Sequence, residues 1–192
     1  MRTGNMYIDF TDLASLGVST IIGVAVRIRY PKLCRIGDHS IIDDFTYISC
    51  ALDMGIFSGI SANCTLLGGG SKIFIGDFVN IGPGCQIISA CEDYVNGGLA
   101  GPCIPSEFKG KSISKDIVID NFVLLGAQTV VLPGAVLPEG MATGAMTLVT
   151  EQEYEPWMVY GGIPARPLKK RKKDDIIKSA SDLLRSIRGQ QS

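Results

Sequence analysis

The feature that most constrains this chain is an aliphatic residue that returns, in long runs, at every sixth position. These positions hold Val18, Val24, Ile36, Ile42, Ile48, Met54, Ile60 and Leu66, then Ile75, Ile81 and Ile87, and finally Ile119, Leu125, Val131, Leu137 and Val149. A hexapeptide period indicates a parallel β-helix. Because six is an even step, successive anchors lie on the same side of an extended chain, whereas helical periodicity fits them poorly. The sequence therefore predicts an all-β solenoid whose stacked coils bury a continuous aliphatic column.

Smaller residues stand two positions before many of these anchors: Cys34, Ser40, Thr46, Ser58, Cys64, Val79, Cys85, Val123 and Ala135. We expect this position also to face inward, so that its cysteines act as small apolar fillers. No CxxC pair occurs that would suggest zinc. Glycine follows several anchors, as at Gly37, Gly76 and Gly126, and we expect these glycines to supply positive φ angles in the turns.

Composition excludes several function classes. Eighteen Lys and Arg residues balance nineteen Asp and Glu residues, so no general nucleic-acid-binding surface is expected. No apolar run reaches the roughly 18 residues that span a bilayer, and no signal peptide is apparent. Six cysteines without such a signal suggest reduced thiols and a cytoplasmic protein. The single histidine excludes metal sites that need two or more His ligands, and no metal is expected.

Five segments resemble the hexapeptide-repeat acyltransferases: IGDHSI, IGDFVN, IGPGCQ, LGAQTV and GGIPARP. The resemblance covers residues 18–168 and implies a left-handed parallel β-helix that forms a homotrimer and takes its acyl group from acyl-CoA. We expect residues 1–17 to cap the first coil. Residues 169–192 contain a basic segment and then one apolar stripe of helical period, which predicts a C-terminal α-helix.

Residues 88–116 interrupt the repeat and predict a protruding loop of functional importance. In the family, a loop here borders the active site between neighbouring subunits, and the common version carries a catalytic His. This chain instead has Glu92, Asp93 and Tyr94, and so resembles sugar acyltransferases with an acidic pair and a Tyr in this loop. The resemblance makes Asp93 and Glu92 candidate catalytic residues and Tyr94 a candidate substrate contact. The alternative is that both acids are merely solvated.

The missing His favours an amine as acceptor. A neutral amine attacks a thioester without prior deprotonation. An amino-sugar nitrogen with a pKa like that of an α-amine, about 7.7–8.0, is partly neutral at pH 7. A hydroxyl is a weaker nucleophile that needs a positioned base. Asp93 or Glu92 would orient the amine or take its proton. His39, the only histidine, is the reserve candidate for the base, although an exposed surface position explains it as well.

The C-terminal part carries the cofactor signal. In the family, the segment that GGIPARP resembles lies against coenzyme A, which implicates Ile163, Pro164 and Arg166. Arg166 and Lys169, the first residue of a basic run, suit the nucleotide phosphates, with a solvated charged face as the alternative for the run. The small pairs Gly126, Ala127 and Gly144, Ala145 would allow the pantetheine arm to approach the backbone closely.

The sequence therefore predicts acyl transfer, most simply of acetyl from acetyl-CoA, to a nucleotide-linked amino sugar in surface-polysaccharide synthesis. O-acetylation of a sugar hydroxyl, with Asp93 or His39 as base, is the second candidate. A non-catalytic hexapeptide scaffold is the third, although the intact GGIPARP segment argues against it. A hexapeptide-fold carbonic anhydrase is excluded because it needs three His ligands.

Overall fold

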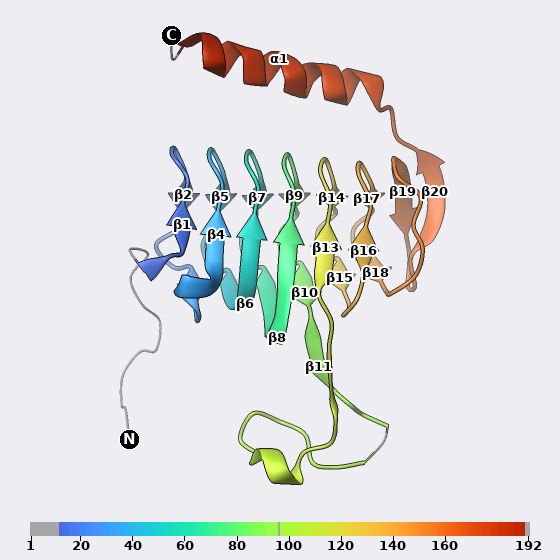
Figure 1. Cartoon of the computed structure of the whole chain (residues 1–192). Coiled ribbons are helices and arrows are strands. Elements are labelled where there is room, and N and C mark those ends of the chain that lie inside the picture. Colours follow the sequence, from blue (N-terminus) through green and yellow to red (C-terminus); the bar gives the residue numbers. More distant parts are fainter. Residues whose placement is uncertain (1–11, 96, 191–192) are drawn as a thin grey trace.

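The computed structural model describes residues 12–95 and 97–190 and shows a parallel β-solenoid of about seven coils with one C-terminal helix (Figure 1). Residues 1–11, which make up most of the predicted N-terminal cap, lie outside the described residues. Ser15 and Leu16 already pair with Arg35 and Ile36 of the next coil, so the solenoid begins three residues before position 18. The predicted β-helix with a protruding loop and a terminal helix is confirmed.

Each coil contributes short strands to three faces. The first face contains β1 (Ser15–Leu16), β4 (Cys34–Ile36), the second half of β6 (Tyr47–Met54) and of β8 (Thr65–Ile75), β13 (Ile117–Ile119) and β16 (Val136–Leu137). The second face contains β2 (Ile21–Ile22), β5 (Ile41–Ile42), β7 (Gly59–Ile60), β9 (Asn80–Ile81), β14 (Leu124–Leu125), β17 (Ala142–Thr143) and β19 (Met158–Gly161). The third face contains β3 (Arg27–Ile28), the first half of β6 and of β8, β10 (Gln86–Ile88), β15 (Val130–Val131) and β18 (Leu148–Val149).

We call the turns from the first to the second face the first corner, those from the second to the third face the second corner, and those back to the first face the third corner. A short 3-10 helix, Pro31–Leu33, occupies the third corner of the first coil. The hairpin of β19 and β20 (Arg166–Lys170) closes the last coil, and α1 (Asp174–Gln190) follows. Within the described part of the chain, no helix combines the length and apolar character needed to cross a membrane.

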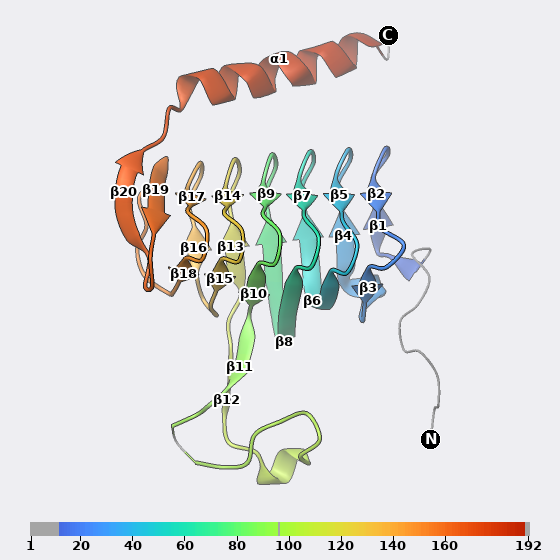
Figure 2. The same ribbon diagram turned by 180° about the vertical axis from the view of Figure 1, so that it is seen from behind.

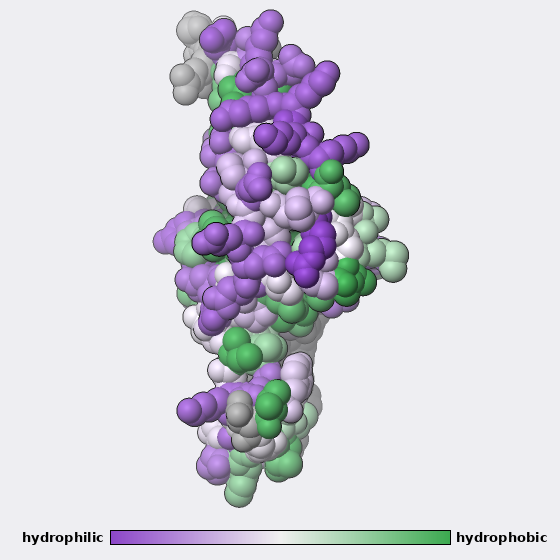
Figure 3. Space-filling model, turned by 90° about the vertical axis from the view of Figure 1, so that its right-hand side faces the viewer, coloured by the Kyte–Doolittle hydropathy of each residue, from purple (hydrophilic) through white to green (hydrophobic). Residues whose placement is uncertain are grey.

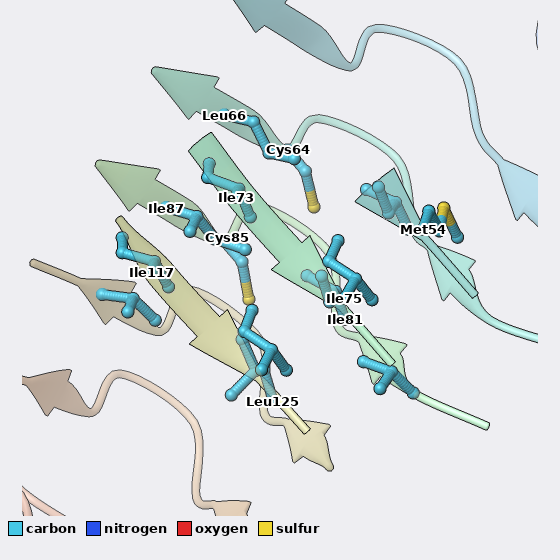
Figure 4. Packing of buried hydrophobic residues seen from close by; sticks show 14 of the residues in the cluster. Met54, Cys64, Leu66, Ile73, Ile75, Ile81, Cys85, Ile87, Ile117 and Leu125 are labelled. Atoms are coloured by element: carbon cyan, nitrogen blue, oxygen red, sulfur yellow. The ribbon is translucent and has the colours of Figure 1, made fainter. Parts of the chain in front are cut away.

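From Ile36 onward the aliphatic anchors form the core that the repeat predicts. In the first coil the prediction is wrong: Val18 is 63% exposed and Val24 is 94% exposed, because Leu16 pairs with Ile36 and Ile22 with Ile42. Ile42, Ile60, Ile81 and Ile87 have no exposed surface, and neighbouring anchors lie side by side along the axis (Figure 4). Six-residue spacing places each anchor in a strand and leaves the intervening residues for a turn. Burial of one such side chain is worth roughly 1.5–3 kcal/mol, so the column supplies the main stabilising term of the solenoid.

The smaller inward position is also buried, and it has a polar role. The Ser58 hydroxyl donates to the Gly76 carbonyl at 2.7 Å, and the Cys64 thiol lies 3.2 Å from the Gly82 carbonyl oxygen. Each donor thus satisfies a turn carbonyl of the next coil. Burial raises the pKa of Cys34 to about 11 and that of Cys50 to about 12, so both remain neutral thiols.

The expectation for the turn glycines is wrong. Gly37 and Gly76 do not have positive φ; that conformation falls two residues later, at His39 (φ 56°) and Phe78 (φ 58°). The glycines are needed because the coils approach closely: a Cβ at Gly37 would lie 2.6 Å from the carbonyl carbon of Gly55.

The first corner carries a stack of aromatic rings beneath α1. Phe57 and Phe78 stack at 5.4 Å between centroids, and Phe78 and Phe122 at 5.3 Å. Helix α1 runs back along this corner toward the N-terminal coils (Figure 1), and Ala180 at its centre is 9% exposed. The predicted apolar stripe faces the solenoid across a groove that Ile176 and Ala180 line with Phe122, while Leu183 remains 41% exposed.

Candidate active site

The small residues predicted to contact coenzyme A come together at the second corner of the last three coils. The Met146 N–H donates to the Ala127 carbonyl at 2.8 Å, and the Leu148 N–H donates to the Gly162 carbonyl at 3.0 Å. Ala127 and Ala145 therefore occupy equivalent positions of successive coils, and Ile163 and Pro164 lie in the corresponding turn of the last coil. Together with Gly126 and Gly144 they form a strip that we call the small-residue corner.

The two glycines of this corner differ in whether coil packing leaves room for a Cβ atom. A Cβ at Gly126 would stand 2.5 Å from the carbonyl carbon of Gly144, so the stacking of the coils requires glycine there. A Cβ at Gly144 would meet no atom closer than the Tyr160 carbonyl oxygen at 3.8 Å, and its φ is not positive. The packing within the chain therefore does not require glycine at position 144.

A groove of about 240 Å³ lies beside the small-residue corner. Its walls include Met146, Leu148 and Ile163. Met146 is 63% exposed and Ile163 is 72% exposed, so apolar surface flanks the corner. No periodic signal marks Met146 in the sequence, because it occupies a turn position where other coils have Phe45, Asn63 or Gly84.

The predicted basic residues lie on the strand that follows this corner in the chain. Arg166 and Lys169 lie on β20, and Arg166 lines a polar depression of about 350 Å³ together with Glu153 and Glu155. Arg171, from the same basic run, is bound to the protein itself through hydrogen bonds to the carbonyl oxygens of Phe122 and Gly140. The hydrophilic surface over this end of the molecule is visible in Figure 3.

The protruding loop leaves the solenoid at the third corner between β10 and β13 (Figure 2). Its base is an antiparallel hairpin of β11 (Ala90–Glu92) and β12 (Ser112–Ser114), and a 3-10 helix, Ser106–Phe108, lies near its tip. The Asp93 N–H donates to the Lys111 carbonyl at 3.0 Å, and its carboxylate accepts from the Val95 N–H at 2.9 Å. Asp93 therefore sits where the hairpin opens into the loop.

Glu92 and Tyr94 have different environments from Asp93. Glu92 forms an ion pair with Lys109, with 3.2 Å between its Oε1 and the Lys109 Nζ, inside the loop. Tyr94 is 84% exposed and therefore available to a ligand or to another subunit. The three predicted loop residues are consecutive, but Asp93 bonds the loop backbone, Glu92 pairs with Lys109 and Tyr94 is exposed.

His39 lies elsewhere. It belongs to the turn that joins β4 to β5, at the first corner, on the side of the solenoid that faces α1, whereas the loop projects from the opposite side (Figure 1). Its ring stacks on Phe57 at 4.7 Å between centroids. Within one chain, the structure does not bring His39 and Asp93 together.

The loop carries more apolar surface than a solvated loop needs. Val95 is 86% exposed, Phe108 is 61% exposed and Leu99 is 58% exposed. Figure 3 shows hydrophobic surface on this loop, well away from the core. The loop therefore exposes three large apolar side chains. Within residues 12–95 and 97–190, no three His, Cys, Asp or Glu side chains gather that could hold a metal ion.

Comparison with known proteins identifies relatives along nearly the whole chain. A dTDP-4-amino-4,6-dideoxy-D-glucose acyltransferase from Escherichia coli is 34% identical over 176 residues, which cover 87% of this chain and 90% of the relative. A chloramphenicol acetyltransferase from Agrobacterium fabrum is 32% identical over 57% of this chain and 56% of its own length. No family model matches.

Solved structures agree with these relatives. AntD, an N-acyltransferase from Bacillus cereus solved with dTDP and 3-hydroxybutyryl-CoA, superposes with a TM-score of 0.84 and 29% identity over 96% of this chain and all of AntD. An AntD variant was solved with dTDP-4-amino-4,6-dideoxyglucose and coenzyme A, and it covers 92% of this chain and 93% of its own with a TM-score of 0.83 and 30% identity. Repeat, fold and relatives therefore agree that this chain belongs to the hexapeptide-repeat acyltransferases.

Proposed function

We propose that this protein transfers a short acyl group, most simply acetyl, from acyl-CoA to the amino group of a dTDP-linked amino sugar. The observation that carries the proposal is the small-residue corner, where the packing of the chain would allow a larger residue than glycine at position 144. The relatives support the choice of acceptor, since both the E. coli relative and AntD are described with dTDP-linked 4-amino-4,6-dideoxyglucose.

The candidate residues have separate roles in the proposed reaction. The small-residue corner would hold the pantetheine arm, and Arg166 and Lys169 would face the nucleotide phosphates of coenzyme A, provided that Arg166 turns away from Glu153 and Glu155. Asp93 would bind and orient the acceptor amine, and Tyr94 would contact the sugar nucleotide. His39, on the opposite side of the solenoid, is left out of this arrangement.

The reaction mainly requires that the protein position the acceptor amine against the thioester carbonyl. The neutral amine attacks the thioester carbonyl, a C–N bond forms, and the C–S bond then breaks to release coenzyme A as the leaving group. Asp93 takes the proton that the amine nitrogen loses. An acceptor amine with a pKa of about 7.7–8.0 is already partly neutral at pH 7, so the orientation of this amine toward the thioester contributes most of the rate enhancement.

We propose that the functional unit is a homotrimer in the cytoplasm. The loop of one chain, with its exposed Val95, Leu99 and Phe108, would pack against a neighbouring chain and bring Asp93 toward that chain's small-residue corner. Burial of such residues removes apolar surface from water and favours assembly. Sedimentation of a monomer at micromolar concentration would contradict this.

Thiol release from acetyl-CoA tests the proposal directly. The acceptors to compare are dTDP-4-amino-4,6-dideoxyglucose and dTDP-glucose, which carries a hydroxyl in place of the amine. Acylation of the amino sugar alone is expected. Acylation of the hydroxyl sugar alone would establish the O-acetyltransferase alternative, and inactivity with both would favour a scaffold or a different acceptor.

A further inference from the structure

Glu92 and Lys109 form an ion pair inside the loop, where both side chains are largely covered. The Lys109 Nζ lies 3.2 Å from the Glu92 Oε1, and the Gly101 N–H donates to the same oxygen at 3.4 Å. Both side chains are about three-quarters covered, with 25% of Lys109 and 27% of Glu92 exposed. Tyr94, two residues from Glu92, is 84% exposed. The acid is therefore occupied inside the loop and not merely solvated.

The Glu92 Oε1 atom connects three segments of the loop. Glu92 ends the outgoing strand β11, Gly101 belongs to the middle of the loop, and Lys109 lies on the returning segment. The returning and middle segments also meet through the backbone, where the Leu99 N–H donates to the Phe108 carbonyl at 3.0 Å. The ion pair fixes the outgoing strand to this pair of segments immediately before Asp93.

Asp93 follows Glu92 directly, and its N–H still belongs to the hairpin through the Lys111 carbonyl. Its carboxylate accepts from the Val95 N–H where the loop opens. A displacement of about 1 Å at a reacting group costs as much as 100-fold in rate. The Glu92 ion pair, one residue away, therefore constrains the backbone that carries the Asp93 carboxylate.

We propose that Glu92 is a positioning residue whose ion pair with Lys109 holds Asp93 in place, and that it does not act on the substrate itself. The proposal rests on the proposed function, in which Asp93 receives the acceptor amine. It changes the role of one member of the acidic pair, and it adds Lys109, which the sequence did not single out.

The test uses Glu92→Gln, Lys109→Met and the exchanged pair Glu92→Lys with Lys109→Glu in the full chain. We expect kcat to fall about 10- to 100-fold in each single variant, with an unchanged KM for acyl-CoA. The exchanged pair should return to within about fivefold of the parent. The pH profile of kcat/KM should keep its shape in every active variant, because the groups that titrate are untouched. Glu107→Gln, in an exposed acid of the same loop, is the matched control.

Hydrogen exchange of the peptide spanning residues 93–111 supplies a readout that does not depend on activity. Exchange should accelerate in both single variants and slow again in the exchanged pair. Full activity of Lys109→Met beside an inactive Glu92→Gln would overturn the proposal, because Glu92 would then act directly. Unchanged exchange in both single variants would also overturn it. If the parent acylates no amino sugar while exchange responds as expected, the proposed function fails and the positioning contact stands.

Discussion

The guanidinium of Arg171 donates a 2.7 Å hydrogen bond to the carbonyl oxygen of Phe122, which lies 49 residues earlier in the chain. A second hydrogen bond, of 2.8 Å, reaches the Gly140 carbonyl of the following coil, and the guanidinium carbon lies 5.7 Å from the centroid of the Trp157 ring in the last coil. One side chain thus ties three successive coils together where the chain leaves the solenoid for α1. Although it belongs to a basic run, its role is structural.

Arg171→Ala should therefore lower the free energy of unfolding by about 1–3 kcal/mol, because two turn carbonyls lose their donor. For a chain of this size each kcal/mol shifts the unfolding midpoint by roughly 2–4 °C. Thermal unfolding followed by circular dichroism measures it. Lys172→Ala, an exposed neighbour, should change the stability by less than about 0.5 kcal/mol. Equal effects of the two substitutions would refute the structural role.

Gly144→Ala should separate binding from stability. The added methyl meets nothing closer than 3.8 Å within the chain, so the unfolding midpoint should not fall. If the pantetheine arm lies on this corner, the methyl intrudes on it at a cost of about 1–3 kcal/mol, and the KM for acyl-CoA should rise roughly 5- to 150-fold. Gly126→Ala is the contrasting variant and should destabilise the fold, since its Cβ would stand 2.5 Å from backbone. An unchanged KM in Gly144→Ala would remove this corner from the site.

Asp93→Asn should reduce kcat/KM by about 10²–10⁴-fold if the carboxylate takes the amine proton, and by less if it only orients the amine. His39→Asn should cost less than about 10-fold, because its ring is stacked at the first corner, across the solenoid from the loop. The pH profile of kcat/KM should rise toward the pKa of the acceptor amine, about 7.7–8.0. If His39→Asn abolished activity while Asp93→Asn retained it, the histidine would be the base and a hydroxyl the better acceptor.

Arg166→Ala should raise the KM for acyl-CoA with little change in kcat, because a contact to a remote phosphate stabilises ground state and transition state alike. A charge-assisted hydrogen bond of about 1.5–3 kcal/mol corresponds to roughly 10- to 150-fold. Initial rates at varied acyl-CoA measure the effect. If KM stays the same, Arg166 serves the polar depression that it shares with Glu153 and Glu155 instead.

The cysteines should differ sharply in reactivity. Cys103 is exposed and should be alkylated first at pH 8, whereas the buried Cys34 and Cys50 should react only after unfolding. Burial raises the pKa of these two thiols to about 11 and about 12 from an ordinary value of 9.0. The folded state therefore holds their protons more tightly, and stability should decline as the pH rises above about 9. Mass spectrometry of alkylated peptides and unfolding at pH 8 and pH 10 measure the two effects.

The sequence by itself determined the solenoid, because coils that stack at a nearly constant step repeat their contacts at a nearly constant spacing. Ser58 and Gly76, which are 18 residues apart, meet across one coil, as do Cys64 and Gly82. From Ile36 onward the six-residue period therefore predicted which residues face the core, whereas in the first coil it wrongly chose the exposed Val18 and Val24. It also predicted that Gly126 and Gly144 occupy equivalent turns.

The tertiary structure decided what the period does not describe. The Glu92–Lys109 pair depends on how a non-repeating loop folds on itself, and the Arg171 contacts depend on where the chain turns back after the last coil. His39 and Asp93 both looked available for catalysis in the sequence, yet their turns leave the solenoid on opposite sides (Figure 1). A periodic pattern specifies the neighbours that coil stacking creates; contacts outside the stack depend on the three-dimensional path of each loop.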